Sequence, residues 1–330
     1  MRSVEETGLV KACAAVLPGD GEDGFALRLD GESAMLCVCD GCGGLGAARY
    51  EALQGRTGAY WASRIAAQQA DAWASAPWTL PSNAEQGETF KAELEQALGS
   101  ALRAFSRAHP PSASRVVGSL RRTLPTTICL ALVSEGAATW REVCFAWAGD
   151  SRGYLLDANG LHQCTADHLR GAPDAFESLA LDAPLSNFLS AEQPVRLSLR
   201  RLRATLPCLA LVATDGAYAC APTPMEFEML LLDCLKRAAS WKGFERALSL
   251  SLRRLACDDA TVLADVRGFL SFQEARSVLL PRREALKRGF VTPVRRRRED
   301  RAFARERWER YRADYDWSQG GRHERMDWRI

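Results

Sequence analysis

The alternation of apolar and polar positions predicts a β-hairpin near the start of the chain. Phe25-Ala-Leu-Arg-Leu alternates and then reaches Asp30-Gly31, and the apolar run over residues 34–39 stops at Asp40-Gly41. Two short apolar segments joined by an Asp-Gly turn are typical of two antiparallel strands. We therefore expect paired strands in the first 44 residues.

Helical spacing of apolar residues appears next and returns later in the chain. It predicts helices at residues 45–73, 85–108, 224–236 and 241–255. Short apolar runs predict further strands at residues 127–133, 142–148, 153–157, 206–214 and 261–266. Residues 165–190 lack a clear period and are predicted to form an irregular insertion. Runs of strands followed by runs of helices indicate an α+β layered fold.

Composition narrows the class of protein. Of the 330 residues 47% are apolar and 25% are charged, as in a globular protein with a sizeable core. No apolar run approaches the roughly 18 residues that a membrane helix needs, and the N-terminal residues do not resemble a secretory signal. The 11 cysteines are an odd number and lie mostly singly in apolar runs. We interpret them as reduced, buried thiols and expect a cytoplasmic protein.

Charge is distributed unevenly along the chain. Residues 281–330 carry 16 Lys and Arg against 9 Asp and Glu, whereas the other 280 residues carry 27 against 32. The apolar pattern thins from about Gly268, so we predict a domain at 1–267 and a basic, aromatic, helical extension at 268–330. The extension is predicted to be mainly a solvated charged helix. Docking of a protein partner is the next interpretation, and nucleic acid is the weakest.

Acidic residues recur where predicted strands end or begin. The positions are Glu22-Asp23-Gly24, Asp40-Gly41, Gly149-Asp150, Asp215-Gly216 and Asp258-Asp259. Any single Asp-Gly is most simply a turn, but five such positions in order favour convergence in space. Clustered carboxylates repel one another unless a cation neutralises them. Oxygen donors suit hard ions such as Mg²⁺ or Mn²⁺.

The ordered motifs resemble the PPM family, the type-2C metal-dependent Ser/Thr protein phosphatases, and a bacterial-like member in particular. The resemblance covers residues 20–266. It rests on Glu22-Asp23, Asp40-Gly41-Cys42-Gly43-Gly44, Leu124-Pro-Thr-Thr-Ile-Cys-Leu, Ala148-Gly-Asp-Ser-Arg-Gly with Cys164-Thr-Ala-Asp-His168, Leu211-Val-Ala-Thr-Asp-Gly216 and Asp258-Asp-Ala-Thr261. It implies a four-layer α-β-β-α sandwich of two antiparallel sheets flanked by helix pairs. It also implies that residues 165–190 form a flap beside the active centre.

The resemblance also implies roles for individual residues. Asp40 would bridge two ions, with the Gly41 carbonyl on one of them. Asp215 and Asp258 would complete the first ion site. Glu22 or Asp23 would support the second, and Asp150 would help to hold a possible third. The expected reaction is hydrolysis of phosphoserine or phosphothreonine in a protein substrate by a metal-activated water.

The sequence departs from the family at the phosphate-binding arginine. Where the family carries it, this chain reads Leu17-Pro18-Gly19-Asp20-Gly21. Arg49, Arg56 or Arg152 are substitutes, although family usage favours a structural role for Arg152. Two interpretations therefore stay open: an active phosphatase, or a weak or inactive pseudophosphatase that binds metal and recognises a partner. A zinc or redox role for Cys39 and Cys42, which have C-x-x-C spacing, is a weaker alternative.

Overall fold

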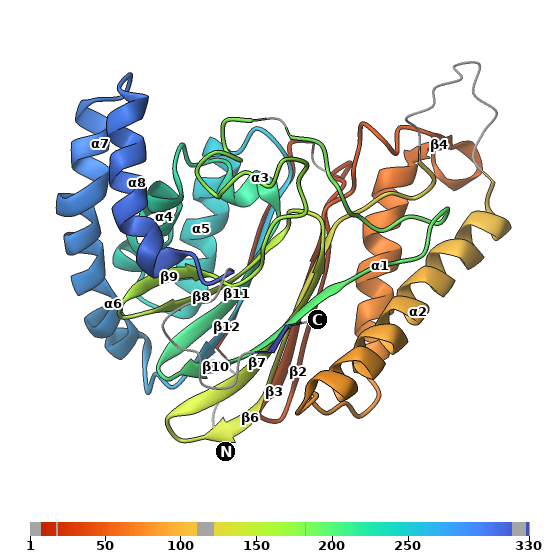
Figure 1. Ribbon diagram of the computed structural model, residues 1–330, viewed down its shortest axis with the longest axis horizontal. Coiled ribbons are helices and arrows are strands. Elements are labelled where there is room, and N and C mark those ends of the chain that lie inside the picture. Colours follow the sequence, from red (N-terminus) through yellow and green to blue (C-terminus); the bar gives the residue numbers. More distant parts are fainter. Residues whose placement is uncertain (1–7, 18, 111–121, 182, 319–327, 330) are drawn as a thin grey trace.

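Two antiparallel sheets packed face to face form the centre of the molecule, with helices on both outer faces (Figure 1). The computed structural model describes residues 8–17, 19–110, 122–181, 183–318 and 328–329. The α+β class and the layered sandwich predicted from the sequence are confirmed.

The first sheet contains six strands in the order β13-β10-β7-β6-β3-β2. Their bounds are β2 (Gly24–Asp30), β3 (Ser33–Cys39), β6 (Ile128–Ala137), β7 (Trp140–Ala148), β10 (Ser198–Thr205) and β13 (Trp328–Arg329). The predicted hairpin is β2 and β3, which pair from Gly24 opposite Cys39 to Asp30 opposite Ser33.

The second sheet contains five strands in the order β1-β12-β11-β8-β9. Their bounds are β1 (Leu9–Ala14), β8 (Arg152–Asp157), β9 (Gly160–Gln163), β11 (Cys208–Ala213) and β12 (Ala260–Arg267). Every residue of β11 is buried. The reason is that the other sheet covers one face of this strand and helices cover the other, so its sequence is apolar without alternation.

Two helices cover the first sheet and two others cover the second. They are α1 (Gly58–Ala74), α2 (Ala84–Ala108), α4 (Pro224–Arg237) and α5 (Trp241–Leu255), while the short α3 (Asp215–Tyr218) follows β11. The buried alanines of α1 allow this helix to lie close to β2 and β3. None of the described helices combines the length and the apolar character needed to cross a membrane.

The helix predicted from residue 45 begins only at Gly58. The preceding residues form β4 (Arg49–Tyr50), a 3-10 turn (Glu51–Leu53) and β5 (Arg56–Thr57). Gln54 and Gly55 both have φ at 65°, which is incompatible with a continuous helix. The Oγ1 atom of Thr57 then accepts the backbone N–H of Tyr60 at 3.1 Å and caps the first turn.

Strand β10 was not predicted from the sequence. Its segment, Ser-Leu-Arg-Arg-Leu-Arg-Ala-Thr, is too rich in arginine to resemble a buried strand. Arg200 and Arg201 are nevertheless buried. Arg200 donates to the carbonyl of Cys164 at 3.0 Å, and Arg201 pairs with Glu142 on β7. These partners, which are distant in sequence, allow the charges to be buried.

Most of the described part of the C-terminal extension is helical and packs on the outer side of α4, whereas β13 pairs with β10 in the first sheet. It contains α6 (Phe272–Leu286), a π-helical turn (Lys287–Val291), α7 (Thr292–Arg296) and α8 (Arg301–Tyr315). Trp308, Tyr311 and Tyr315 are almost fully buried in one hydrophobic core with residues of α4. Residues 319–327 and Ile330 lie outside the described residues, and the division into two domains stays a prediction.

Candidate metal centre

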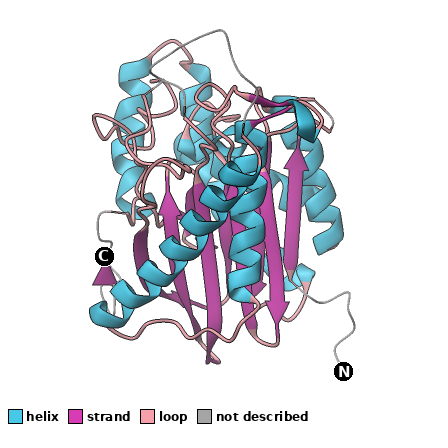
Figure 2. Cartoon of the chain, turned by 90° about the vertical axis from the view of Figure 1, so that its right-hand side faces the viewer, coloured by secondary structure: helices cyan, strands magenta, loops and turns pink. Residues whose placement is uncertain are grey.

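The sheet topology brings the acidic positions to one end of the strands. Asp40 follows β3, Asp150 follows β7 and Asp215 follows β11. Asp23 precedes β2 and Asp258 precedes β12, each of which runs antiparallel to its neighbour. In antiparallel pairs the end of one strand lies beside the start of the next. Figure 2 shows many of the loops gathered at this end of the sheets. We call these five aspartates the carboxylate edge.

Asp215 is the common neighbour within the carboxylate edge. Its charge raises the pKa of each of four other carboxyls, which are those of Asp23, Asp40, Asp150 and Asp258. For Asp40, burial is the largest cause, followed by Asp215, and the pKa lies well above its usual range. Asp23 and Asp150 add to this effect, because their charges also raise the pKa of Asp40. The positive charge of Arg152 lowers the pKa of Asp150, but Arg152 already pairs with Asp167.

Asp23 and Asp150 are the two members whose pKa falls near neutrality. Burial is the largest cause and raises the pKa of Asp23 to about 7. Hydrogen bonds from Thr261 and Thr214 lower this pKa, and the charge of Asp215 raises it. Burial and the charge of Asp215 raise the pKa of Asp150 to about 8. Desolvation disfavours the charged carboxylate, and a nearby negative charge adds to this effect.

One oxygen of Asp23 is buried without a partner. Its Oδ2 atom accepts hydrogen bonds from the Oγ1 atoms of Thr214 at 2.9 Å and Thr261 at 2.7 Å. Its Oδ1 atom has no hydrogen-bond partner among the described residues. A buried carboxylate oxygen without a partner is costly. It is therefore a suitable position for a cation or for water that a cation holds.

Glu22 lies beside the carboxylate edge, and burial is the main cause that raises its pKa. Thr57 donates a hydrogen bond to its Oε1 atom. A Cβ atom at Gly43 would lie 2.3 Å from Oε2 of Glu22, and one at Gly41 would lie 2.5 Å from the Ala59 carbonyl. Neither glycine has a positive φ. Gly41 is therefore required for close approach to the Ala59 backbone, whereas a side chain at Gly43 would displace the carboxylate of Glu22.

Thr126, Thr127 and Asp259 hold the backbone around the carboxylate edge by hydrogen bonds. The sequence analysis did not assign them this role. The backbone N–H of Asp40 donates to Oγ1 of Thr127 at 3.1 Å, and Oγ1 of Thr126 donates to the Asp40 carbonyl at 2.8 Å. Asp259 accepts the backbone N–H of Val16 and of Glu22, at 2.8 and 2.5 Å. The signal was present in the sequence, because each of these residues lies within or next to a quoted motif.

The acidic residues of the carboxylate edge and Glu22 have the type of donor atom that a hard divalent cation prefers. The acidic groups provide only oxygen, the ligand that Mg²⁺ and Mn²⁺ prefer, and the buried Oδ1 atom of Asp23 lacks a partner. Within the described residues, however, no three His, Cys, Asp or Glu side chains are arranged so that they could hold an ion. The assignment of Glu22, Asp23, Asp40, Gly41, Asp150, Asp215 and Asp258 as metal ligands therefore stays a prediction.

A cavity of about 530 Å³ opens beside the carboxylate edge and contains two arginines. Glu22 and Asp258 line it together with Arg49 and Arg56. Arg56 pairs with the exposed Asp20, and its guanidinium lies 4.9 Å from the centre of the Tyr60 ring. Arg49 donates to the Gly55 carbonyl at 2.7 Å. Two of the three candidate substitutes for the missing arginine, Arg49 and Arg56, therefore lie next to acidic site residues.

Arg152, the third candidate substitute, is buried and binds other side chains of the protein, which indicates a structural role. It is only 1% exposed, and its guanidinium donates to both carboxylate oxygens of Asp167, at 2.9 and 2.6 Å. It also donates to Ser178 at 2.7 Å and lies 3.8 Å from the centre of the Tyr218 ring. Because its donors bind Asp167 and Ser178, Arg152 fixes these two residues of the predicted flap (residues 165–190) to the start of β8.

The chain has the fold of the PPM, or type-2C, Ser/Thr phosphatases. It is similar to the Ser/Thr phosphatase Stp1 from Staphylococcus aureus, with 18% identity and a TM-score of 0.58 over 81% of this chain and 99% of that one. It is also similar to PppA, a key regulatory component of T6SS in Pseudomonas aeruginosa, with 20% identity and a TM-score of 0.52 over 79% of this chain and 97% of that one. The Mycobacterium tuberculosis phosphatase PstP/Ppp is 21% identical, with a TM-score of 0.51 over 78% of this chain and 99% of that one. Neither a family model nor a curated protein sequence matches the chain.

Proposed function

We propose that this protein is a metal-dependent phosphatase that hydrolyses phosphoserine or phosphothreonine in protein substrates. The observation that carries the proposal is the carboxylate edge, in which Asp23, Asp40, Asp150 and Asp258 all interact with Asp215. A chain without a cation ligand gains nothing from holding five carboxylates together, because they repel one another and are partly desolvated. The type-2C fold of the chain supports the same proposal.

Mg²⁺ or Mn²⁺ held by these residues would lower the pKa of a water molecule and offset charge on the phosphoryl oxygens. In this proposal Asp40 and Asp215 are the central ligands, and Asp258, Glu22 and Asp23 complete the set. Thr126 and Thr127 hold the backbone of Asp40 in place. Correct orientation of the ligands by such partners affects both metal affinity and activity.

Arg56 is the group we propose for binding the substrate phosphate. It lines the cavity that Glu22 and Asp258 also line. Its present partner, Asp20, is 57% exposed in its side chain. An ion pair with an exposed carboxylate is weak, and a phosphate dianion could displace it. Because Arg56 extends from β5 and not from the segment before Glu22, it would compensate for the missing arginine from another element.

Hydrolysis of p-nitrophenyl phosphate with Mn²⁺ or Mg²⁺ tests the proposal. We expect turnover that a chelator abolishes and that Asp40→Ala and Asp215→Ala remove. Asp30→Ala is a matched control, because Asp30 also precedes a glycine but lies at the other end of the β2–β3 hairpin, exposed. Undiminished turnover in both site variants would refute the assignment.

A pseudophosphatase is the second candidate, favoured by two observations. The segment before Glu22 contains no arginine, and no described group of three side chains is arranged to hold an ion. Calorimetry with Mn²⁺ separates the two functions when it is combined with a phosphopeptide panel. Tight metal binding without hydrolysis of any peptide supports the second candidate, and metal-dependent turnover excludes it.

A further inference from the structure

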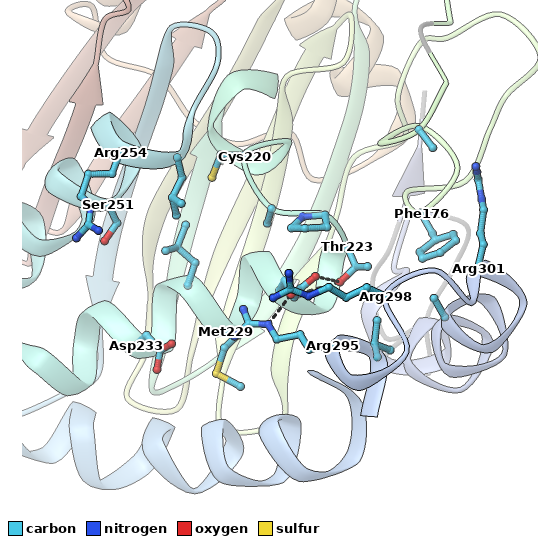
Figure 3. Close-up of a pocket in the computed structure, with 18 of the residues that line it drawn as sticks. Phe176, Cys220, Thr223, Met229, Asp233, Ser251, Arg254, Arg295, Arg298 and Arg301 are labelled. Atoms are coloured by element: carbon cyan, nitrogen blue, oxygen red, sulfur yellow. Dashed lines mark hydrogen bonds and ion pairs between the residues drawn. The ribbon is translucent and has the colours of Figure 1, made fainter. Parts of the chain in front are cut away.

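A second cavity lies on the side of the molecule where the C-terminal extension packs. A cavity of about 790 Å³ is enclosed by α4, the end of α5, the predicted flap and the segment from α7 to α8. It shares no lining residue with the cavity beside the carboxylate edge. Figure 3 shows Ser251 and Arg254 at one end, Phe176 and Arg301 at the other, and Thr223, Arg295 and Arg298 between them. We call it the arginine cavity.

The lining of the arginine cavity is largely apolar. Its apolar members come from four segments of the chain: Phe176, Ala180, Ala221, Pro222, Met229, Leu230, Leu255, Val294 and Ala304. A concave, mostly apolar surface of this volume with a few polar groups is the usual form of a small-molecule site. The apolar part predicts a ligand with a hydrocarbon or aromatic body.

The charged members of the lining are mainly arginines, which are Arg237, Arg254, Arg295, Arg298 and Arg301. The two acidic members are already neutralised, because Glu226 binds Arg295 and Asp233 binds Arg283.

The charges of most of these arginines are not neutralised by a carboxylate of the described residues. In the described residues Arg254, Arg298 and Arg301 have no carboxylate partner, and Arg237 donates only to Cys234 and Ser251. The cavity therefore carries uncompensated positive charge next to apolar surface.

The walls of the cavity are held in place by packing, so the cavity is formed before any ligand binds. Phe176 stacks on Trp308, with the ring centres 6.1 Å apart. Asp174, two residues earlier, accepts the Nε1–H of Trp308 at 3.0 Å and pairs with Arg305 at 2.9 Å. These contacts join α8 to the predicted flap. A preformed site loses less conformational entropy on binding.

We propose that the arginine cavity is a binding site for a small amphipathic anion, a molecule with an apolar body and a carboxylate, phosphate or sulfonate group. The apolar lining binds the body by burying its surface. Arg298 and Arg301 bind the anionic group by charge-assisted hydrogen bonds, and Arg254, at the opposite end, adds to the positive charge of the cavity. The proposal does not depend on the proposed catalytic function.

Calorimetry with three probes of equal chain length tests the proposal. The probes are octanesulfonate, octanoate and octanol, used below micelle-forming concentrations with a chelator present, so that no cation occupies the carboxylate edge. We expect saturable one-to-one binding of the two anions and affinity for octanol at least about ten-fold weaker. The order of affinity between octanesulfonate and octanoate assigns the anionic group. Equal binding of octanol, or no saturable binding of any probe, overturns the proposal.

Two sets of variants locate the binding. Arg298→Glu with Arg301→Glu should weaken octanesulfonate at least about ten-fold, and Leu230→Trp, which fills the cavity, should abolish binding. Arg288→Glu with Arg296→Glu is the matched control, because both residues are exposed, lie in the extension and do not line the cavity. An equal loss in the control pair would mean that surface charge alone attracts the probe, and would overturn the site. Unchanged melting temperatures verify that each variant is folded.

Discussion

The carboxylate edge and the arginine cavity each bring side chains of one charge to one site, but they do so in different ways. At the carboxylate edge the aspartates are partly buried, and burial is the largest cause of every pKa shift. At the arginine cavity the guanidinium groups of Arg254, Arg298 and Arg301 are exposed to solvent. Buried like charges cost stability, whereas exposed ones cost little. The comparison predicts that the first region is destabilising without its cation and that the second is nearly neutral without its ligand.

The predicted flap connects the two regions. Arg152 binds Asp167 and Ser178 on the side of the carboxylate edge. Trp308 and Arg305 bind Asp174 on the side of the arginine cavity. The same segment is thus fixed from the phosphatase-like body and from the extension. Variants can test each side separately.

Trp308→Ala should have the largest effect, which is a loss of overall stability. Trp308 is fully buried, stacks on Phe176 and donates to Asp174. Truncation of a buried aromatic side chain costs about 3–5 kcal/mol. Urea unfolding should show this loss, while Phe303→Ala, at a partly buried position on the same helix, should cost less. A loss under about 1 kcal/mol would mean that α8 is not part of the core.

Asp40→Ala should reduce metal-dependent turnover more than about 100-fold. Residues that only orient metal ligands already contribute about 10–100-fold, and Asp40 is proposed as a direct ligand. The measurement is kcat/KM for p-nitrophenyl phosphate with Mn²⁺, with Asp30→Ala as the control. A fall of less than ten-fold would contradict the proposed centre.

The metal-free protein should lose stability as pH rises from about 4 to about 8. The folded-state pKa values of Asp23 and Asp150, about 7 and about 8, lie above the ordinary value of 3.8. The folded state therefore binds more protons than the unfolded state in this range, and raising the pH through the folded pKa removes that stabilisation. Urea unfolding at several pH values, with a chelator present, measures the slope. A stability that rises over this range would exclude the proposed repulsion.

Asp150→Asn should stabilise the metal-free protein at pH 8 by about 1–2 kcal/mol, because it removes one repelling charge from the carboxylate edge. Asp30→Asn, at an exposed turn, should change the free energy of unfolding by less than about 0.5 kcal/mol. The same measurement with Mn²⁺ should remove or reverse the gain in Asp150→Asn. A destabilisation in the absence of metal would show that Asp150 is satisfied within the chain.

Arg298→Ala should have the smallest effect. Its side chain is exposed and has no carboxylate partner in the described part of the chain, so the free energy of unfolding should change by less than about 0.5 kcal/mol. Thermal unfolding without ligand measures it. A loss above about 1 kcal/mol would mean that Arg298 stabilises the fold and is not reserved for a ligand.

Much of the fold was accessible from local patterns. The β2–β3 hairpin, α2, α4 and α5 have strong periodicity or a turn between them, and the structure places them within one or two residues of the prediction. The predicted start of α1 was 13 residues too early. The helical spacing of apolar residues continues through Gly55, but the backbone at Gly55 has a positive φ and is not helical. Strand β10 was missed because its arginines find partners only after the chain has folded.

The candidate site was accessible as a set of residues but not as a geometry. The position of Asp215 among four other carboxylates follows from strand order and pairing, which no local pattern contains. The support of Asp23 by Thr214 and Thr261 joins residues 191 and 238 positions away. Such contacts depend on the register of two different strands.

By itself, the sequence determined the α+β class, the hairpin and helix pattern and the order of the acidic motifs. Each of these depends on neighbouring residues and on the period of side chains along one element. Only the tertiary structure decided that Arg56 lines the cavity beside Glu22, that Arg152 is buried on Asp167, and that the basic extension encloses an arginine cavity. These outcomes depend on which surfaces pack together and which charges find partners, and burial sets both in three dimensions.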